Sequence, residues 1–190
     1  MSENARRSRT SLWLIGALCV APVVASYVAF YYAPPARHTN YGELLAAGPL
    51  PDARLALVDG TPFQFSRLRG KWVLLMVDSG RCDEYCRRKL FSLRQLRLTQ
   101  GKDMERIERA WLISDDVVPV PAAVGDFPGM WLIRAAGSEL LGQLPVARAL
   151  ADHIYVVDPL GNLMLRYPRD ADPGRIIKDL ARLLKTSRIG

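Results

Sequence analysis

Cysteine and histidine are scarce in this sequence, which has three cysteines and two histidines in 190 residues. A structural zinc ion usually takes four such ligands, and the sequence supplies few beyond one close pair of cysteines. No Gly-rich phosphate loop, Ser-His-Asp order or paired-carboxylate motif is recognisable. No basic run is long enough to indicate nucleic-acid binding. These absences narrow the chemistry to Cys82, Cys86 and the residues around them.

The overall composition is that of a packed globular protein, with 49% hydrophobic and 24% charged residues. The net charge is +7. Without residues 1–36, 23 of the 26 basic and 18 of the 19 acidic residues remain, a net charge of +5. Such a mildly basic domain could bind the surface of an anionic membrane or an acidic partner. The third interpretation of the charge is a solvated surface with no partner.

A run without charged residues covers residues 11–32. As an α-helix it would extend about 33 Å, enough to cross a hydrocarbon layer of about 30 Å. The run exceeds the core of an ordinary signal peptide and ends in aromatic residues suited to the membrane interface. We therefore predict a retained transmembrane helix over residues 11–32, with cleavage after Ala25 as the alternative.

Three arginines, Arg6, Arg7 and Arg9, lie just before this span. The positive-inside bias predicts that residues 1–10 stay in the cytoplasm and that the rest of the chain crosses the membrane. In a Gram-negative bacterium this gives a single-pass protein of the inner membrane with its C-terminal domain in the periplasm. A twin-arginine export signal is the weaker interpretation. An oxidising compartment permits a disulfide, but Cys19 lies in the span with nothing to pair with.

Four prolines discourage regular structure directly after the span, at positions 34, 35, 49 and 51. They predict a semi-rigid tether over residues 33–51, followed by one domain over residues 52–190.

The domain shows alternating strand and helix patterns. In chain order we expect a hairpin over 53–65, a buried strand over 71–78, an amphipathic helix with apolar residues over 90–98, a strand over 109–116, a weakly patterned region, a hairpin over 153–168 and a helix over 170–185. Asp172 is placed to cap the last helix. A strand, a helix and a second strand in this order predict a parallel βαβ unit. The order indicates an α/β thioredoxin-like fold over roughly residues 50–187, with a central mixed sheet flanked by helices.

The cysteine motif "CDEYC" follows the first buried strand. If both cysteines lie on the helix, their sulfurs stack at positions i and i+4 with room for an ion between them. Two soft thiolates select Cu(I) or zinc. The helix dipole and nearby cations, including Arg81 and Lys89, predict at least one thiol with a lowered pKa, which helps metal binding and thiol exchange alike. An inert structural disulfide is the remaining alternative.

These residues resemble the Sco/SenC family, copper proteins that help to assemble the binuclear copper centre of cytochrome c oxidase. That family has one N-terminal span, an exported thioredoxin-like domain, a CxxxC motif after the first buried strand and an aspartate after the next strand. Cys82 and Cys86 match the motif, Leu90 matches a leucine four residues beyond it, and Asp116 matches the aspartate. The prolines that the family carries in and after its motif are replaced here by "DEY" and "RRK".

The resemblance implies copper, as Cu(I) or Cu(II), bound by Cys82, Cys86 and a distant histidine. His153 is the expected third ligand, although it lies about three residues closer to the following strand than the family's histidine. Asp152 is placed to orient its ring. His38 belongs to the tether and is expected to be solvated, and four methionines are expected in the core, Met76, Met104, Met130 and Met164.

The predicted function is that of a membrane-anchored copper metallochaperone for cytochrome c oxidase assembly, rather than an enzyme. Its expected partners are a copper-receiving oxidase subunit or other assembly factors, and no nucleic acid. The first alternative is a thiol-disulfide oxidoreductase that reduces a partner, with Cys82 as the attacking sulfur and Cys86 as the resolving one. The second alternative is a degenerate thioredoxin-like scaffold that only binds partners.

Overall fold

The computed structural model describes residues 3–32, 40–120, 125 and 127–187. The chain divides into two compact units, Met1–Thr39 and Asn40–Gly190, and each is described by itself. The first unit contains α1 (Glu3–Tyr32), whose segment Trp13–Tyr32 is exposed and is long and apolar enough to cross a membrane. The helix predicted from the uncharged run is therefore present, and it carries Cys19 on its surface.

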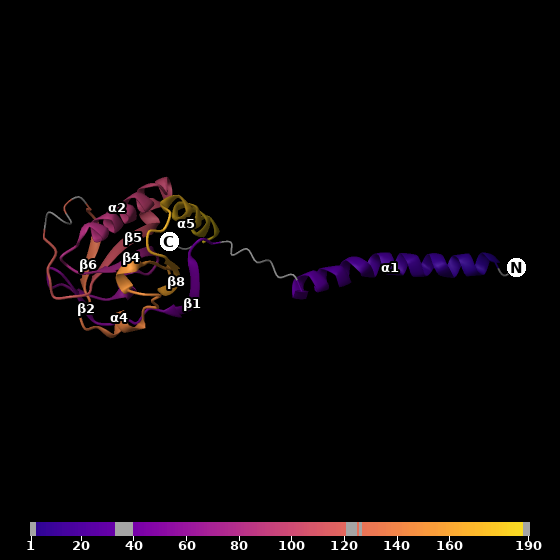
Figure 1. The fold of residues 1–190 in the computed structure, drawn as a ribbon, viewed down its shortest axis with the longest axis horizontal. Helices are drawn as coiled ribbons and strands as arrows, with labels where there is room; N and C mark the ends of the chain where they lie inside the picture. Colours follow the sequence, from indigo (N-terminus) through magenta and orange to yellow (C-terminus); the bar gives the residue numbers. More distant parts are fainter. Residues whose placement is uncertain (1–2, 33–39, 121–124, 126, 188–190) are drawn as a thin grey trace. The chain divides into compact units, whose positions relative to one another are not determined.

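The second unit is built on one mixed sheet of eight strands (Figure 1). Across the sheet, the strands are β1 (Glu43–Pro49), β8 (Asn162–Tyr167), β7 (Ile154–Val157), β4 (Trp72–Asp78), β5 (Ile107–Ile113), β6 (Met130–Arg134), β2 (Leu55–Leu57) and β3 (Pro62–Phe63). The neighbours β4, β5 and β6 run parallel, and the other pairs are antiparallel. The predicted parallel βαβ unit is thus confirmed, with β4 at the centre of the sheet.

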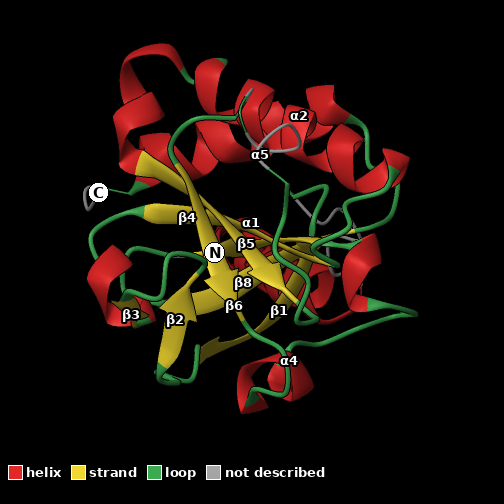
Figure 2. Cartoon of the chain, turned by 90° about the vertical axis from the view of Figure 1, so that its left-hand side faces the viewer, coloured by secondary structure: helices red, strands yellow, loops and turns green. Residues whose placement is uncertain are grey.

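Helices cover both faces of this sheet (Figure 2). One face carries the two long helices, α2 (Glu84–Leu98) and α5 (Pro173–Thr186). The other face carries the short helix α4 (Glu139–Gln143) and the 3₁₀ turn η1 (Phe65–Leu68). Two further 3₁₀ turns are η2 (Gly101–Arg106) and η3 (Leu150–Asp152). The result is the predicted thioredoxin-like arrangement of a mixed sheet between helices.

The apolar run of β4 explains its central place, because all seven of its residues are buried. Leu74 and Met76 face the core under α2 and α5. Val73, Leu75 and Val77 face the second core under α4 and η1. Apolar side chains on both faces of β4 are therefore buried in the two cores. This burial stabilises the fold by roughly 25 cal/mol for each Å² of apolar surface removed from water.

The other predicted elements are found close to their expected places. β2 and β3 form a hairpin whose turn uses Gly60 at φ +87°, a conformation that side chains disfavour. β7 and β8 form the second predicted hairpin. Asp172 caps α5 as predicted, since its carboxylate accepts a hydrogen bond of 2.8 Å from the Gly174 N–H.

The predicted tether was too long at its C-terminal end. Residues 43–49, expected to lack regular structure, form β1, which pairs with β8. Pro49 is tolerated at the end of β1 because β1 is an edge strand, where a missing N–H donor leaves no partner unpaired. The remaining tether residues 33–39 lie outside the described part of the chain.

The entry of the chain into this domain is fixed by a buried carboxylate of α5. One oxygen of Asp179, a residue only 3% exposed, accepts hydrogen bonds from the N–H groups of Tyr41 at 2.7 Å and Gly42 at 2.9 Å. The Tyr41 hydroxyl in turn accepts a bond of 3.2 Å from the Asp172 N–H. Gly42 has no room for a side chain, because a Cβ there would come within 2.8 Å of the Tyr167 ring.

We predict that Asp179→Ala lowers the free energy of unfolding of the domain by about 2 kcal/mol or more, because it leaves two backbone N–H groups without an acceptor. Urea unfolding provides the measurement. Asp179→Asn keeps an acceptor oxygen and should lose less. Equal losses in the two variants would show that the hydrogen bonds to Tyr41 and Gly42 contribute little.

Candidate functional site

The two cysteines lie where β4 gives way to α2. Asp83 is the N-cap of α2, and its carboxylate accepts a hydrogen bond of 2.9 Å from the Cys86 N–H. Cys86 therefore sits in the first turn of the helix. Cys82 lies before the cap at φ +44°, so the expectation that both cysteines stack on the helix at i and i+4 is wrong. A capping aspartate between them starts the helix after the first cysteine.

Cys82 and Cys86 are joined by a disulfide, with their Cα atoms 5.0 Å apart. Cys86 is fully buried and Cys82 is 6% exposed, and both belong to the core between the sheet and α2. A left-handed backbone conformation is rare for a residue with a Cβ. The loop is therefore held in an unusual backbone conformation at Cys82, the more exposed residue of the disulfide.

The loop before Cys82 is held by Asp115, which follows β5. Its carboxylate accepts bonds from the Ser79 hydroxyl at 2.5 Å, the Gly80 N–H at 2.9 Å and the Val117 N–H at 3.2 Å. The Ser79 hydroxyl bond, followed by the Gly80 N–H bond, lowers the pKa of Asp115 below its ordinary value, so this acceptor is charged at neutral pH.

Asp115, rather than Asp116, is thus the aspartate of the β5 end that contacts the cysteine loop. The sequence resemblance indicated Asp116, but that residue is exposed. Trp111 and Ile113 face the same core as the cysteines, and side chains alternate along a strand. Continuing the alternation past Ile113 selects Asp115, a signal that the sequence contained.

Gly80 allows the close approach of the loops that follow β4 and β5. A Cβ at this position would lie 1.8 Å from the Val117 carbonyl oxygen, a distance that no side chain can occupy. Gly80 therefore lets the cysteine loop pass directly against the backbone after Asp115.

A buried ion pair lies beneath the cysteine helix. The Lys89 ammonium is 2.7 Å from the Asp78 carboxylate, and the two residues are 4% and 9% exposed. The ammonium also donates to the carbonyl oxygens of Val77 at 3.1 Å and Ala151 at 2.5 Å, which uses its three protons. Burial lowers the pKa of Lys89, and the hydrogen bond that Lys89 donates to the Asp78 carboxylate opposes that change. Lys89 thus joins α2, the end of β4 and η3.

This pairing corrects the predicted role of Lys89. Its charge was expected to add to the positive field at the thiols, but the Asp78 carboxylate neutralises it locally. Arg87 and Arg88 make surface contacts with Glu84 at 3.3 and 4.0 Å. Because these side chains are largely exposed, solvent screens their effect on the cysteines.

Tyr85, between the two cysteines in sequence, connects α2 to the loop after β8. The Arg169 guanidinium lies 4.2 Å from the Tyr85 ring centre. The Tyr85 hydroxyl donates to the Asp152 carbonyl oxygen at 3.3 Å, and the Asp152 carboxylate lies 2.6 Å from Arg169. Burial raises the pKa of Tyr85. Asp152 was expected to orient His153, but its carboxylate contacts Arg169 instead.

The structure does not bring His153 to the cysteines. The strand that follows it, β7, does pair with β4. However, Ile154 faces the α2 core with the cysteines, while Tyr155 faces the α4 core. The extended backbone at His153 turns its ring, like that of Tyr155, to the α4 side, and the two rings make an edge contact at 5.7 Å.

Both ring nitrogens of His153 have backbone partners. Nε2 accepts a hydrogen bond of 3.3 Å from the Ala147 N–H, and Nδ1 lies 3.0 Å from the Tyr167 carbonyl oxygen. An accepting Nε2 places the proton on Nδ1, which then donates to Tyr167. The Nε2 lone pair that would bind a metal already accepts the hydrogen bond from the Ala147 N–H. This conformation of His153 does not fit a ligand of a copper ion at Cys82 and Cys86.

Other potential metal ligands in the described part of the chain do not form a cluster either. Among the described residues no group of three or more His, Cys, Asp and Glu side chains is placed to hold a metal. Met76 is in the core under α2, and Met130 and Met164 pack against it, as predicted. His38 lies outside the described part of the chain. The reduced motif would therefore offer two sulfur ligands.

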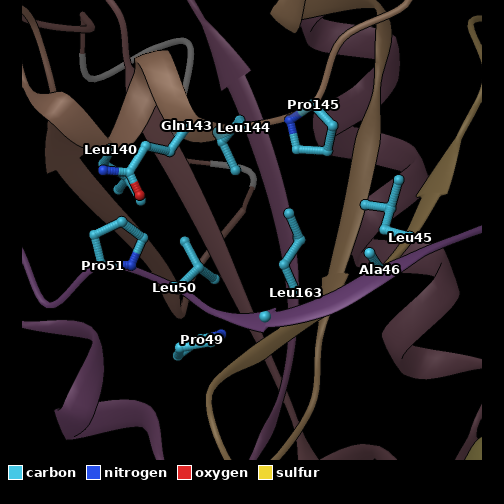
Figure 3. Close-up of a pocket in the computed structure, with 11 residues that line it drawn as sticks. Leu45, Ala46, Pro49, Leu50, Pro51, Leu140, Gln143, Leu144, Pro145 and Leu163 are labelled. Atoms are coloured by element: carbon cyan, nitrogen blue, oxygen red, sulfur yellow. The ribbon is translucent and has the colours of Figure 1, made fainter.

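A hollow of about 290 Å³ lies on the α4 side, between β1 and α4 (Figure 3). Its walls are mainly leucine and proline, and its lining residues include no ionisable side chain. It therefore contributes no group to the chemistry of the cysteines, which belong to the other core.

Comparison with known proteins agrees with the fold and places the chain in a family. Residues 72–187, more than half of the chain, match the family described as "transmembrane-like, thioredoxin-like, C-terminal domain", and the chain belongs to that family. Among curated proteins, no sequence matches significantly.

Solved structures of Sco proteins share the fold. Yeast Sco1 with copper bound is 18% identical, with a TM-score of 0.61 over 74% of this chain and 93% of that one. Apo Sco1 from Thermus thermophilus is 23% identical, with a TM-score of 0.56 over 79% and 98%. The thioredoxin domain of a thiol-disulfide oxidoreductase from Bacteroides vulgatus is 17% identical, with a TM-score of 0.56 over 74% and 99%. The fold is thus similar to Sco/SenC copper proteins and to a thiol-disulfide oxidoreductase.

We predict that Lys89→Met lowers the free energy of unfolding by about 3–5 kcal/mol, because the Asp78 carboxylate stays buried without a counter-ion. Thermal and urea unfolding provide the measurement. The double variant Lys89→Met/Asp78→Leu should recover part of the loss. Arg88→Met, on the exposed side of the same helix, is the matched control and should change stability by less than about 0.5 kcal/mol. A Lys89 variant as stable as this control would contradict the assigned role of the ion pair.

Proposed function

We propose that this protein is a membrane-anchored, Sco-like copper metallochaperone whose Cys82–Cys86 pair alternates between a disulfide and a dithiol that takes Cu(I). The observation that carries the proposal is the cysteine pair itself. It lies between the central strand and the first turn of α2, in a fold similar to Sco structures that were solved with copper bound. In this role copper is the cargo, and the protein would pass it on.

The donor set supports Cu(I) more than other ions. Two thiolates are soft ligands that can hold Cu(I) without a third donor, whereas zinc needs further ligands. His153 would join the site as the proposed third ligand only after Nε2 leaves the Ala147 N–H and its segment changes face. We therefore propose a primary site of two sulfurs, with His153 as a ligand of a rearranged state.

Thiol-disulfide exchange is the second candidate, and the position of His153 favours it. In the reduced protein, the Cys82 thiolate would attack a disulfide of the partner and release one partner thiolate. The Cys86 thiolate would then attack the Cys82 sulfur, release the second partner thiolate and form the disulfide seen here. Cys82 suits the first step, because it is the more exposed of the two.

The proposed setting is the periplasmic face of the inner membrane. The apolar helix α1 supports membrane anchoring. The arginines before it support the orientation. The proposed partner is the copper-receiving subunit of cytochrome c oxidase or another assembly factor, a proposal that draws on the likeness to Sco proteins. A thioredoxin-like scaffold without either activity is the outcome if both chemical tests below are negative.

The reduced full-length protein, loaded anaerobically with Cu(I), should hold about one copper per chain. Cys82→Ser and Cys86→Ser should each weaken the affinity at least tenfold, about 1.4 kcal/mol, because a single thiolate remains. Competition with a chromogenic Cu(I) chelator measures both quantities.

His153→Ala is the matched control for these variants. It should keep the Cu(I) stoichiometry, because the ring lies on the other face of the sheet. Loss of a thiolate-to-Cu(II) absorption in this variant would show that the ring reaches copper in the rearranged state. Unchanged Cu(I) binding in the double serine variant would rule out the chaperone proposal, and rapid reduction of a disulfide substrate by the parent would then favour exchange.

A reporter enzyme that is active only in the periplasm, fused after Gly190, should be active, because the N-terminal arginines hold the short N-terminus inside. A reporter that is active only in the cytoplasm is the matched fusion and should be silent. The opposite pattern would place the cysteines in a reducing compartment and contradict the proposed setting.

A further inference from the structure

The exposed side of α5 is a basic stripe. Arg175, Lys178, Arg182 and Lys185 recur at helical spacing and are all exposed. The one acidic residue within the helix, Asp179, is buried and holds the backbone at Tyr41 and Gly42. Positive charge thus lines the outer side of α5 along its whole length, and the one carboxylate inside the helix, Asp179, lies 3.9 Å from Arg182.

The chain from the membrane anchor enters the domain against this helix. Asp179 holds the N–H groups of Tyr41 and Gly42, as described above. The Arg175 guanidinium also lies 3.8 Å from the Tyr41 ring centre. The first described residues of the domain are therefore fastened to α5 at both its N-cap and its middle.

The distance from the anchor to this entry point is limited by chain length. Only residues 33–39 separate α1 from Asn40. The eight Cα–Cα steps from Tyr32 to Asn40 span at most about 29 Å. This chain length limits how far Asn40 can lie from a membrane that holds α1.

From these three observations we propose that the basic stripe of α5 docks on the anionic phospholipid headgroups of the membrane that holds α1. The stripe supplies the charge and the short connection supplies a high local concentration of headgroups. Each cation near an anionic membrane surface favours the docked state by about fivefold. Four of them suffice to orient a domain that is already tethered, although none would hold a free protein tightly. The proposal is independent of copper binding and of thiol exchange.

Docking through α5 would also orient the cysteine helix. Side chains from the first half of α2, including Tyr85 and Arg88, line one pocket with Pro173 and Ile176 at the start of α5. At the other end, Arg106 of η2, just after α2, donates to the Leu184 carbonyl oxygen. The two helices therefore run side by side in the same direction. With α5 on the membrane, the CDEYC motif stays close to the bilayer, within reach of a partner that is itself membrane-bound.

The test uses the full-length chain in vesicles that contain dansyl-labelled lipid, which accepts energy from excited tryptophan. A Trp13→Phe parent removes the emission of the span, so that Trp72, Trp111 and Trp131 of the domain report the proximity of the domain to the membrane. Vesicles of equal parts phosphatidylglycerol and phosphatidylcholine are compared with vesicles of phosphatidylcholine alone. We expect greater energy transfer with phosphatidylglycerol, and high salt should remove the difference.

The variant Lys178→Gln/Lys185→Gln removes two charges of the stripe and spares Arg175 and Arg182, which have contacts within the domain. The ratio of docked to undocked domain should fall roughly 30-fold with phosphatidylglycerol. Arg54→Gln/Arg148→Gln removes two exposed charges outside α5 and is the matched control, which should behave as the parent.

Two results would overturn the proposal. Equal energy transfer in the two kinds of vesicle would show that the stripe does not respond to anionic lipid. An acidic protein would then be the remaining candidate partner of the stripe. Equal losses in the α5 variant and in the Arg54/Arg148 control would show an effect of net charge without a docking face. Copper stoichiometry in the α5 variant should match the parent, so a failure here is distinguishable from a failure of the proposed function.

Discussion

The buried contact between Lys89 and Asp78 is the constraint on which the cysteine site depends. A charge pair withdrawn from water is stable only when its remaining hydrogen-bonding capacity is satisfied, and here the carbonyl oxygens of Val77 and Ala151 do so. These partners come from β4 and η3, while the ammonium comes from α2. One side chain therefore fixes the helix of Cys86 against the strand before Cys82 and against the segment that leads into His153.

The positions of the cysteines and of His153 distinguish the two reactions that the motif could perform, thiol-disulfide exchange and copper binding. Cys82 and Cys86 share the core under α2, whereas His153 is hydrogen-bonded on the α4 side of the sheet. Exchange of electrons through two sulfurs needs nothing from the far side. A three-ligand copper site needs His153 to leave two backbone partners, each of which stabilises its present position by about 1 kcal/mol. Copper binding through the sulfurs alone is compatible with the structure as it stands.

The sequence was sufficient to predict the parallel pair β4–β5 and the two hairpins, because long apolar runs and hairpins have strong periodic signals. It was also sufficient for the place of the cysteine motif directly after β4 and for the cap at Asp172. Strand β1 was missed, because prolines argue against a strand unless that strand is known to be at an edge. The positions of Lys89 and His153 depend on which face of an element each side chain occupies. For Lys89, a charged residue in a helical pattern predicts solvent, and only the tertiary partner Asp78 reverses that expectation.

The point at which the chain enters the domain also decides how the domain would respond to mechanical load. A pull on the N-terminal segment reaches Tyr41 and Gly42 first, where two N–H groups share one carboxylate oxygen of Asp179. It then reaches β1, an edge strand with an irregular register against β8. Such a strand can peel away one hydrogen bond at a time, while β4 is flanked on both sides. Under tension, β1 would thus detach from β8 before the cysteine loop is disturbed. Unfolding of β1 would in this way protect the rest of the domain from the load.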